Sequence, residues 1–117
     1  MAAVGTQRRW LDVEVEIAGT ATGRGRGLLG RSSLDPGHGM WIAPCPQVHT
    51  FGMRFPIDVA FCGGDGTVLH TVRSMRPWRV SRWVRGGAGA LEVAAGVLGA
   101  AGVEIGDRLG WAGAPFA

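Results

Sequence analysis

Glycine divides this chain into short segments, and this constrains its fold more than any other feature. The 117 residues contain 21 glycines that follow no fixed period, so a collagen-like repeat is excluded. Many tight turns between short elements are expected, which favours strands over long helices. With 46% hydrophobic residues, the chain can form one core but is too short for a second domain.

Six short segments have the residue pattern of β-strands. In the first, residues 10–17, Leu, Val, Val and Ile alternate with Asp, Glu and Glu, the period of a strand with one buried face. The other expected strands cover residues 39–43, 57–62, 67–72, 90–94 and 107–111. Within residues 57–62, Ile57, Val59 and Phe61 alternate with Asp58, Ala60 and Cys62, which again predicts a strand.

Turn residues separate these segments. Gly63-Gly64-Asp65-Gly66 supplies the backbone freedom of a hairpin turn between the third and fourth expected strands. Asp35-Pro36-Gly37 predicts another turn, inside a loop over residues 32–39. One helical turn is expected at Val97-Leu98. Residues 20–31 have poor helix propensity because of their glycines, but Thr22 could cap a second short helix there.

These elements predict a mainly β fold, an antiparallel sandwich or a partly closed, jelly-roll-like barrel with one or two short helices. The expected domain covers residues 10–112, with short tails at 1–9 and 113–117.

Several motifs resemble those of a prokaryotic family known only as domain of unknown function 192. The resemblance extends from about Val13 to Leu109, and HTFGMRFPID at residues 49–58 is its most diagnostic element. The other matching motifs follow in the family's order: GRGRGLLGR (23–31), GMWI (39–42), PWR (77–79), LEV (91–93) with Gly96, and residues 102–107. The resemblance implies the same mainly β fold, and it supplies no chemistry.

Residues 44–62 concentrate reactive side chains within apolar sequence. His49 could tie a loop to the backbone or contact a ligand. Arg54 and Asp58 could form a buried, architectural pair, or Arg54 could anchor a carboxylate or phosphate with its planar guanidinium. We expect Asp58 to orient other groups rather than react, and Phe51 and Met53 to contribute apolar walls.

A second candidate region carries arginines at every third position: Arg73, Arg76, Arg79, Arg82 and Arg85, with Trp78 and Trp83 between them. No acidic residue lies between Asp65 and Glu92. Arginine and tryptophan together can bind single-stranded nucleic acid. The sequence disfavours this use, because a period of three matches neither a strand nor an α-helix and need not place the arginines on one face.

Cys45, His49 and Asp58 could act as nucleophile, base and orienting carboxylate of a thiol-dependent enzyme. The pattern is weak, because Cys45 lies between two prolines and no oxyanion-hole sequence is recognisable. Zinc could nominally bind His38, Cys45, His49 and Cys62, but their spacings match no common metal pattern. We therefore expect no metal and no cofactor, and a protein that acts through binding rather than catalysis.

The preferred hypothesis is a small binding domain for a small anionic ligand. The 49–58 block and the arginine-rich segment would line one concavity, with His49, Phe51, Met53, Arg54, Asp58, Arg76, Trp78 and Arg79 as its ligand-binding residues. A protein partner that docks on the exposed tryptophans and arginines is the main alternative.

Location and assembly are predicted from what the chain lacks. No apolar run resembles a signal-peptide core or a membrane span, so the expectation is a cytoplasmic protein with reduced Cys45 and Cys62. The net charge of +3 predicts no partner by itself. A monomer or a weak dimer is expected, since exposed strand edges can pair.

Overall fold

The computed structural model describes residues 7–18 and 31–116. Its elements are, in chain order, β1 (Arg8–Trp10), β2 (Glu14–Ala18), β3 (His38–Ile42), β4 (Ile57–Cys62), β5 (Val68–Met75), β6 (Gly89–Ala94), α1 (Val97–Ala100) and β7 (Arg108–Gly110). The predicted mainly β class with one short helix is confirmed. In the described ranges, no helix has the length and apolar character needed to cross a membrane.

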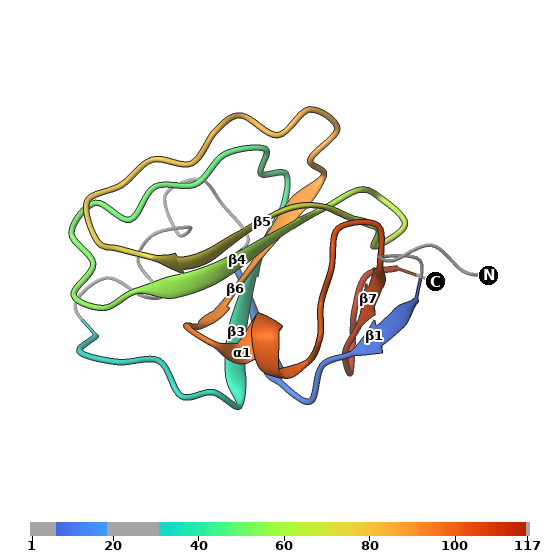
Figure 1. The fold of residues 1–117 in the computed structure, drawn as a ribbon, viewed down its shortest axis with the longest axis horizontal. Helices are drawn as coiled ribbons and strands as arrows, with labels where there is room; N and C mark the ends of the chain where they lie inside the picture. Colours follow the sequence, from blue (N-terminus) through green and yellow to red (C-terminus); the bar gives the residue numbers. More distant parts are fainter. Residues whose placement is uncertain (1–6, 19–30, 117) are drawn as a thin grey trace.

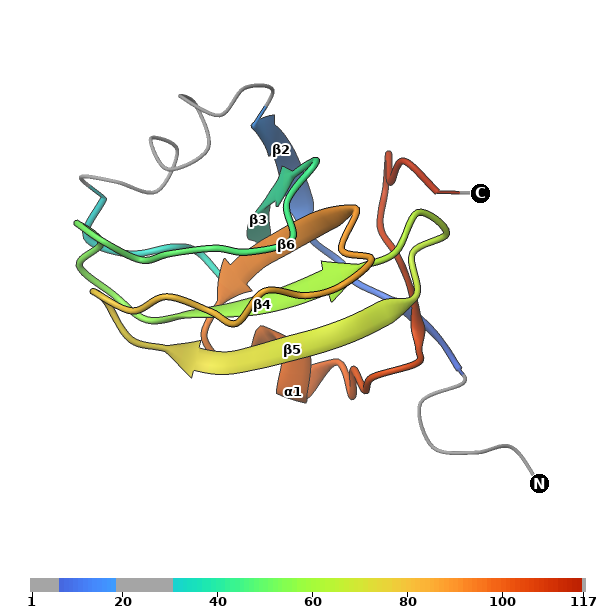
Figure 2. The same ribbon diagram turned by 90° about the horizontal axis from the view of Figure 1, so that it is seen from above.

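The strands form a five-stranded sheet in the order β2-β3-β6-β4-β5 and a small sheet of β1 and β7 (Figures 1 and 2). Three pairs in the large sheet are antiparallel, as expected, whereas β2 pairs with β3 in parallel and β1 pairs with β7 in parallel. The two parallel pairs were not predicted. The described strands do not close a barrel.

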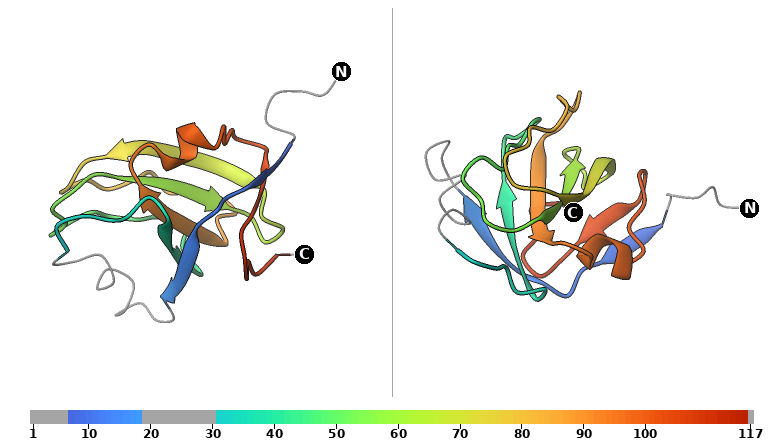
Figure 3. Two further views of the ribbon diagram at one scale, coloured as in Figure 1. Left: turned by 90° about the horizontal axis from the view of Figure 1, so that it is seen from below. Right: turned by 60° about the vertical axis from the view of Figure 1, so that its left-hand side comes forward.

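The predicted strand at residues 10–17 is divided between the two sheets (Figure 3). Leu11 donates a backbone hydrogen bond to Gly110 next to the small sheet, and Glu14 donates one to Gly37 next to the large sheet. Leu11 is buried between the two strands, while Ile17, expected on the same buried face, is 71% exposed. Alternation with a period of two depends only on residues close together in the chain and does not specify which strand pairs with the segment. It therefore could not predict that the chain passes from one sheet to the other.

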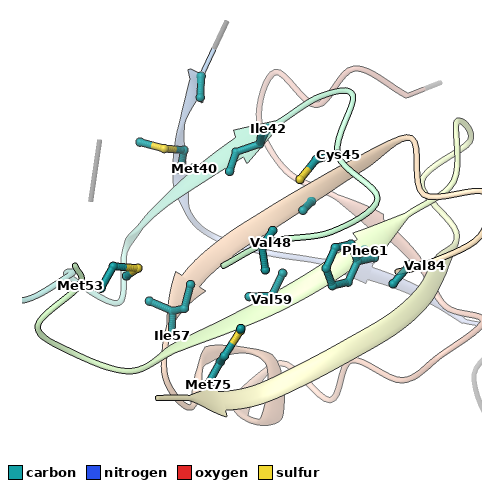
Figure 4. Close-up of a cluster of buried hydrophobic side chains, with 12 residues drawn as sticks. Met40, Ile42, Cys45, Val48, Met53, Ile57, Val59, Phe61, Met75 and Val84 are labelled. Carbon is teal, nitrogen blue, oxygen red and sulfur yellow. The ribbon is translucent and has the colours of Figure 1, made fainter. Parts of the chain in front are cut away.

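β4 and β6 lie inside the large sheet, and all residues of both are buried. One face carries Ile57, Val59 and Phe61 of β4 in a first core cluster, drawn in Figure 4, and the other carries Ala60 and Cys62 in a second cluster. The predicted strand at residues 57–62 is confirmed, and both of its faces are buried because both faces of the sheet are covered.

The predicted turns and helical turn are present. Gly63 N donates to Thr67 O at 2.9 Å, and Gly66 takes a φ of 87° within the β4–β5 hairpin. Gly37 N donates to the Asp35 carboxylate at 2.7 Å. The predicted helix with Thr22 lies outside the described residues.

Two long connections, residues 43–56 and 76–88, cover the first cluster where a sandwich would have a second sheet. They contribute Val48, Met53 and Val84 to that cluster. The connections run side by side in Figures 1 and 2. The domain was predicted to begin at residue 10, and β1 begins two residues earlier, at Arg8.

Candidate ligand-binding surface

The two connections are joined by a short ladder of backbone hydrogen bonds. His49 and Val80 form an isolated antiparallel bridge. Four bonds of 2.7–3.0 Å flank it: Thr50 N to Arg79 O, Trp78 N to Thr50 O, Ser81 N to Val48 O and Val84 N to Pro46 O. The ladder brings the 49–58 block and the arginine-rich segment together, as the preferred hypothesis requires.

Thr50 is the centre of this ladder. Its side chain is fully buried, and its hydroxyl donates to Arg76 O at 2.6 Å and accepts from Arg79 N at 2.9 Å. Because one hydroxyl satisfies groups on both sides of Trp78, it sets the shape of the loop that carries the two arginines. Sequence reasoning missed Thr50; the only available signal was a small polar residue between His49 and Phe51 in a largely apolar block.

Ser81 and Gln47 support the ladder further along. The Ser81 hydroxyl accepts from Val48 N at 3.0 Å and donates to Arg82 O at 2.9 Å. The Gln47 side chain donates to Ser81 O at 3.0 Å. These side-chain hydrogen bonds join the two irregular segments. The segments occupy the position that a regular second sheet would have in a sandwich.

An exposed column of rings lies on the ladder and consists of His49, Phe51 and Trp78, here called the aromatic column. The ring centres of His49 and Phe51 are 4.9 Å apart, and those of Phe51 and Trp78 are 6.0 Å apart, with an angle of 28° between the planes of each pair. Phe51 is 44% exposed and Trp78 is 65% exposed. His49 Nδ1 accepts a 3.3 Å hydrogen bond from Phe51 N, so a neutral His49 carries its proton on Nε2.

Trp78 has an unusual backbone conformation. Its φ of 63° lies in the left-handed region, which costs a residue with a large side chain on the order of 1–3 kcal/mol. The 3.0 Å hydrogen bond from Trp78 N to Thr50 O holds it there. The fold therefore holds Trp78 in a strained conformation, with its indole beside Phe51.

A shallow hollow of about 440 Å³ lies between the end of β5 and residues 79–81, which follow Trp78 in the chain and include Val80, the bridge partner of His49. Arg73, Arg76 and Arg79 line it. All three are exposed; Arg73 donates to Val103 O at 2.5 Å, and Arg79 Nη1 donates to Trp78 O at 3.4 Å. The ion pairs of the described residues are Arg9–Asp107 and Arg31–Glu16, so neither Arg76 nor Arg79 has an acidic partner in residues 7–18 and 31–116.

The surroundings of the hollow are positively charged. Residues 66–91 contain no acidic side chain, and Glu92, the next carboxyl group, is buried in the sheet. An anion would therefore meet favourable potential across this surface.

Asp58, a predicted ligand-binding residue, has a different place in the structure. It is fully buried, and its carboxylate accepts backbone hydrogen bonds from Ser74, Gly96 and Leu98 at 2.8–3.1 Å. These bonds join β4, a left-handed residue in β5 and the start of α1. Asp58 therefore stabilises the fold, as an orienting role would suggest, but it does not reach the hollow.

Two further predicted site residues lie apart from the hollow. Met53 is buried in the first core cluster. Arg54 is exposed, does not line the hollow and forms no ion pair with the buried Asp58, so the architectural pair is not made. Of the eight predicted residues, the structure gathers His49, Phe51, Arg76, Trp78 and Arg79.

The structure does not assemble Cys45, His49 and Asp58. Cys45 is buried in the first core cluster, and its thiol donates to Gln47 O at 3.1 Å. Asp58 faces the opposite side of the sheet, because it alternates with Ile57 and Val59 and bonds to Leu98 of the second cluster. The β-sheet therefore separates the thiol from the carboxylate.

The nominal zinc ligands are separated in the same way. Cys45 belongs to the first core cluster and Cys62 to the second, on opposite faces of the sheet. Burial and, to a lesser degree, the charge of Asp65 raise the pKa of Cys62 to about 12, so this group is a thiol at neutral pH. In the part of the chain that the structure describes, no group of three or more His, Cys, Asp or Glu side chains could hold a metal ion.

Comparison with known proteins identifies the family. A model of DUF192, described as "Uncharacterized ACR", matches residues 2–111. A UPF0127 protein of Pyrococcus abyssi is 32% identical over 104 residues, which cover 84% of this chain and 86% of the relative.

Two crystal structures share the fold. One, from Sinorhizobium meliloti and named as a candidate transcription regulator, is 30% identical with a TM-score of 0.71, over 82% of this chain and 79% of that one. The other, a protein of unknown function from Novosphingobium aromaticivorans, is 22% identical with a TM-score of 0.74, over 82% of this chain and 73% of that one. With a family match over nearly its whole length, the chain belongs to the uncharacterised DUF192 family.

Proposed function

We propose that this protein binds a small anionic ligand at the hollow beside the aromatic column. The observation that carries the proposal is the pair Arg76 and Arg79: both are exposed, both line the hollow, and neither has an acidic partner among the described residues. Thr50 binds the backbone of both residues and so limits the reach of the two guanidinium groups.

Arginine suits this role because its planar guanidinium donates paired hydrogen bonds to carboxylate or phosphate oxygens. A hydrogen bond to a charged group contributes about 1.5–3 kcal/mol in proteins, so two arginines can hold a small anion where screening is limited. The hollow is open, and we expect modest affinity that weakens with added salt.

Binding is favoured over thiol catalysis. A nucleophilic cysteine needs an accessible thiolate. Cys45 is only 1% exposed and Cys62 is fully buried. We also propose a cytoplasmic location, which is supported by two buried cysteines that are not bridged to each other.

Two other kinds of partner would use the same surface. A protein could dock on the exposed apolar side chains of Phe51, Trp78, Val80 and Trp83. A single-stranded nucleic acid could follow the arginine-rich segment, and the candidate transcription regulator of Sinorhizobium meliloti is an observation in its favour. The small anion is preferred because Arg76 and Arg79, which have no acidic partner among the described residues, line one hollow rather than a long groove.

The test is calorimetric titration with inorganic phosphate, pyrophosphate and citrate at low salt. The variant Arg76→Gln/Arg79→Gln removes the two lining guanidinium groups. Its matched control, Arg82→Gln/Arg85→Gln, removes the same charge from the same segment outside the hollow.

We expect at least one anion to bind, with affinity reduced about tenfold or more in the first variant and little changed in the control. An equal loss in both variants would mean that net charge alone attracts the anion, and the proposed site would be wrong. If none of the three anions binds, a pull-down with the intact chain tests the protein partner next.

A further inference from the structure

We propose that the ligand of this surface carries a flat aromatic ring as well as its negative charge, and that it is a nucleoside phosphate, either free or within a single strand. This inference rests on the proposed anion site and names the chemical class of its ligand. It is based on the aromatic column, because a simple inorganic anion has no ring that could stack on these side chains.

The geometry of the column favours stacking. Its planes lie within 28° of parallel at successive ring pairs, so Trp78 presents its indole in the orientation that continues the stack. Parallel, offset rings are a favoured arrangement of aromatic pairs, and a nucleobase stacks on an indole in the same way. Phe51 supports Trp78 from one side, and the indole remains 65% exposed.

The position of Trp78 is determined by the fold rather than by chance exposure. Its left-handed backbone, with φ of 63°, is retained by a hydrogen bond to the same Thr50 that binds Arg76 O and Arg79 N. Strained residues of this kind cluster at functional sites. Thr50 thus holds the backbone of all three residues, Trp78 through its carbonyl oxygen and Arg76 and Arg79 through its buried hydroxyl.

The ring site and the anion site are adjacent. Arg79 follows Trp78 in the chain, and its guanidinium lies 3.4 Å from Trp78 O. Arg76 precedes Trp78 by two residues and lines the same hollow as Arg79. A ligand that spans them needs a flat ring joined to an anionic group by a short connection, which describes a nucleotide.

A second hollow offers a useful contrast. It has a volume of about 290 Å³ and lies at β1 and β7, with Trp10, Arg8, Arg9 and Arg108 in its lining. Asp65 also lines it, and Arg9 is already paired with Asp107 at 3.2 Å. Its positive charge is therefore largely compensated, and its exposed Trp10 serves as a control for non-specific stacking.

The experiment compares four probes by calorimetry at low salt: adenosine, inorganic phosphate, adenosine 5′-monophosphate and a short single-stranded oligonucleotide. The variants are Trp78→Ala and, as matched controls, Trp83→Ala and Trp10→Ala, whose indoles are 65% and 67% exposed in the native protein. Trp78→Phe retains a ring, and thermal melting of each variant confirms that it folds.

We expect the monophosphate to bind more tightly than phosphate or adenosine alone. Trp78→Ala should weaken it about tenfold, the loss typical of one base–aromatic stack, while Trp78→Phe retains most of the affinity and both controls are unchanged. Comparable affinity for the monophosphate and the oligonucleotide identifies a free nucleotide. Much tighter binding of the oligonucleotide, with the same Trp78 dependence, identifies a strand.

Two results would overturn the inference, and they can be told apart. If phosphate and the monophosphate bind equally, and if Arg76→Gln/Arg79→Gln lowers the affinity while Trp78→Ala leaves it unchanged, the anion site stands and the proposed ring site is wrong. If no probe and no simple anion binds, the proposed function itself fails together with this inference.

Discussion

At the residue scale, Glu92 is the least expected group in the molecule. It lies in β6, opposite Met40 of β3 and Val59 of β4, and is only 5% exposed. No described residue forms a hydrogen bond or ion pair with its carboxyl group. Burial raises the pKa of Glu92 from 4.5 to about 8, so the group is mainly protonated at neutral pH.

This raised pKa predicts a pH-dependent stability. Below pH 4.5 the carboxyl group is protonated in both the folded and the unfolded protein, so its burial costs little stability. Between pH 4.5 and about 8 it is ionised only in the unfolded chain, so rising pH lowers the free energy of unfolding by about 1.4 kcal/mol per pH unit. We expect Glu92→Gln to remove this dependence and to be more stable than the native chain at pH 9. Urea unfolding from pH 5 to 9 measures it, and parallel curves for the two proteins would contradict it.

At the element scale, side chains hold together segments that are not regular secondary structure. Thr50 and Ser81 do this for the two connections over the first core cluster. Asp107 holds together the segments around the small sheet. Its fully buried carboxylate accepts hydrogen bonds from Gln7 N, Glu104 N and Arg9 Nε at 2.9–3.2 Å. Burial alone would raise the pKa of Asp107, but these hydrogen bonds and the charge of Arg9 lower it.

The ladder predicts the effect of Thr50→Val, which keeps the size of the side chain and removes its hydroxyl. The carbonyl of Arg76 and the N–H of Arg79 lose a buried partner, which costs about 1–3 kcal/mol of stability. Because both arginines are then held less firmly, anion affinity should also fall. Urea unfolding and phosphate titration measure the two effects. Thr71→Val, at a half-buried position of β5, is the control, and equal effects in both variants would exclude a special role for Thr50.

At the scale of the whole molecule, aromatic residues join the two sheets. Trp41 of β3 packs against Trp111 and Phe116, which follow β7, with ring centres 5.3–5.4 Å apart. Space for the Trp41 indole exists because residue 89 has no side chain. A Cβ atom at Gly89 would lie 2.2 Å from the Trp41 ring.

Gly89→Ala should therefore displace Trp41 and loosen the contact between the sheets. Overpacking of this kind typically costs about 1–3 kcal/mol. Gly64→Ala is the matched control, because no atom lies within 4 Å of the added Cβ. Thermal melting and near-ultraviolet circular dichroism measure stability and indole packing. Equal melting temperatures for the two variants would show that the interior adjusts freely around Trp41.

Sequence patterns predicted most strands because these depend on local chemistry. The glycines at residues 63–66 specified the β4–β5 hairpin, and the apolar runs at residues 39–43 and 90–94 became β3 and β6. Thr50 could not be selected in the same way. Its importance comes from Arg76 and Arg79, which are more than 25 positions away in the chain.

The sequence by itself determined the mainly β class, the family and the residues from which a site could be built, since these follow from composition, periodicity and motif. Only the tertiary structure decided which of them meet. Alternation does not choose a partner strand, so it hid the split between β1 and β2 and the burial of both faces of β4. The sheet directs Asp58 away from Cys45, while backbone pairing between distant loops brings His49 and Phe51 to Trp78. Long-range hydrogen bonds and packing make that selection, and no local pattern encodes them.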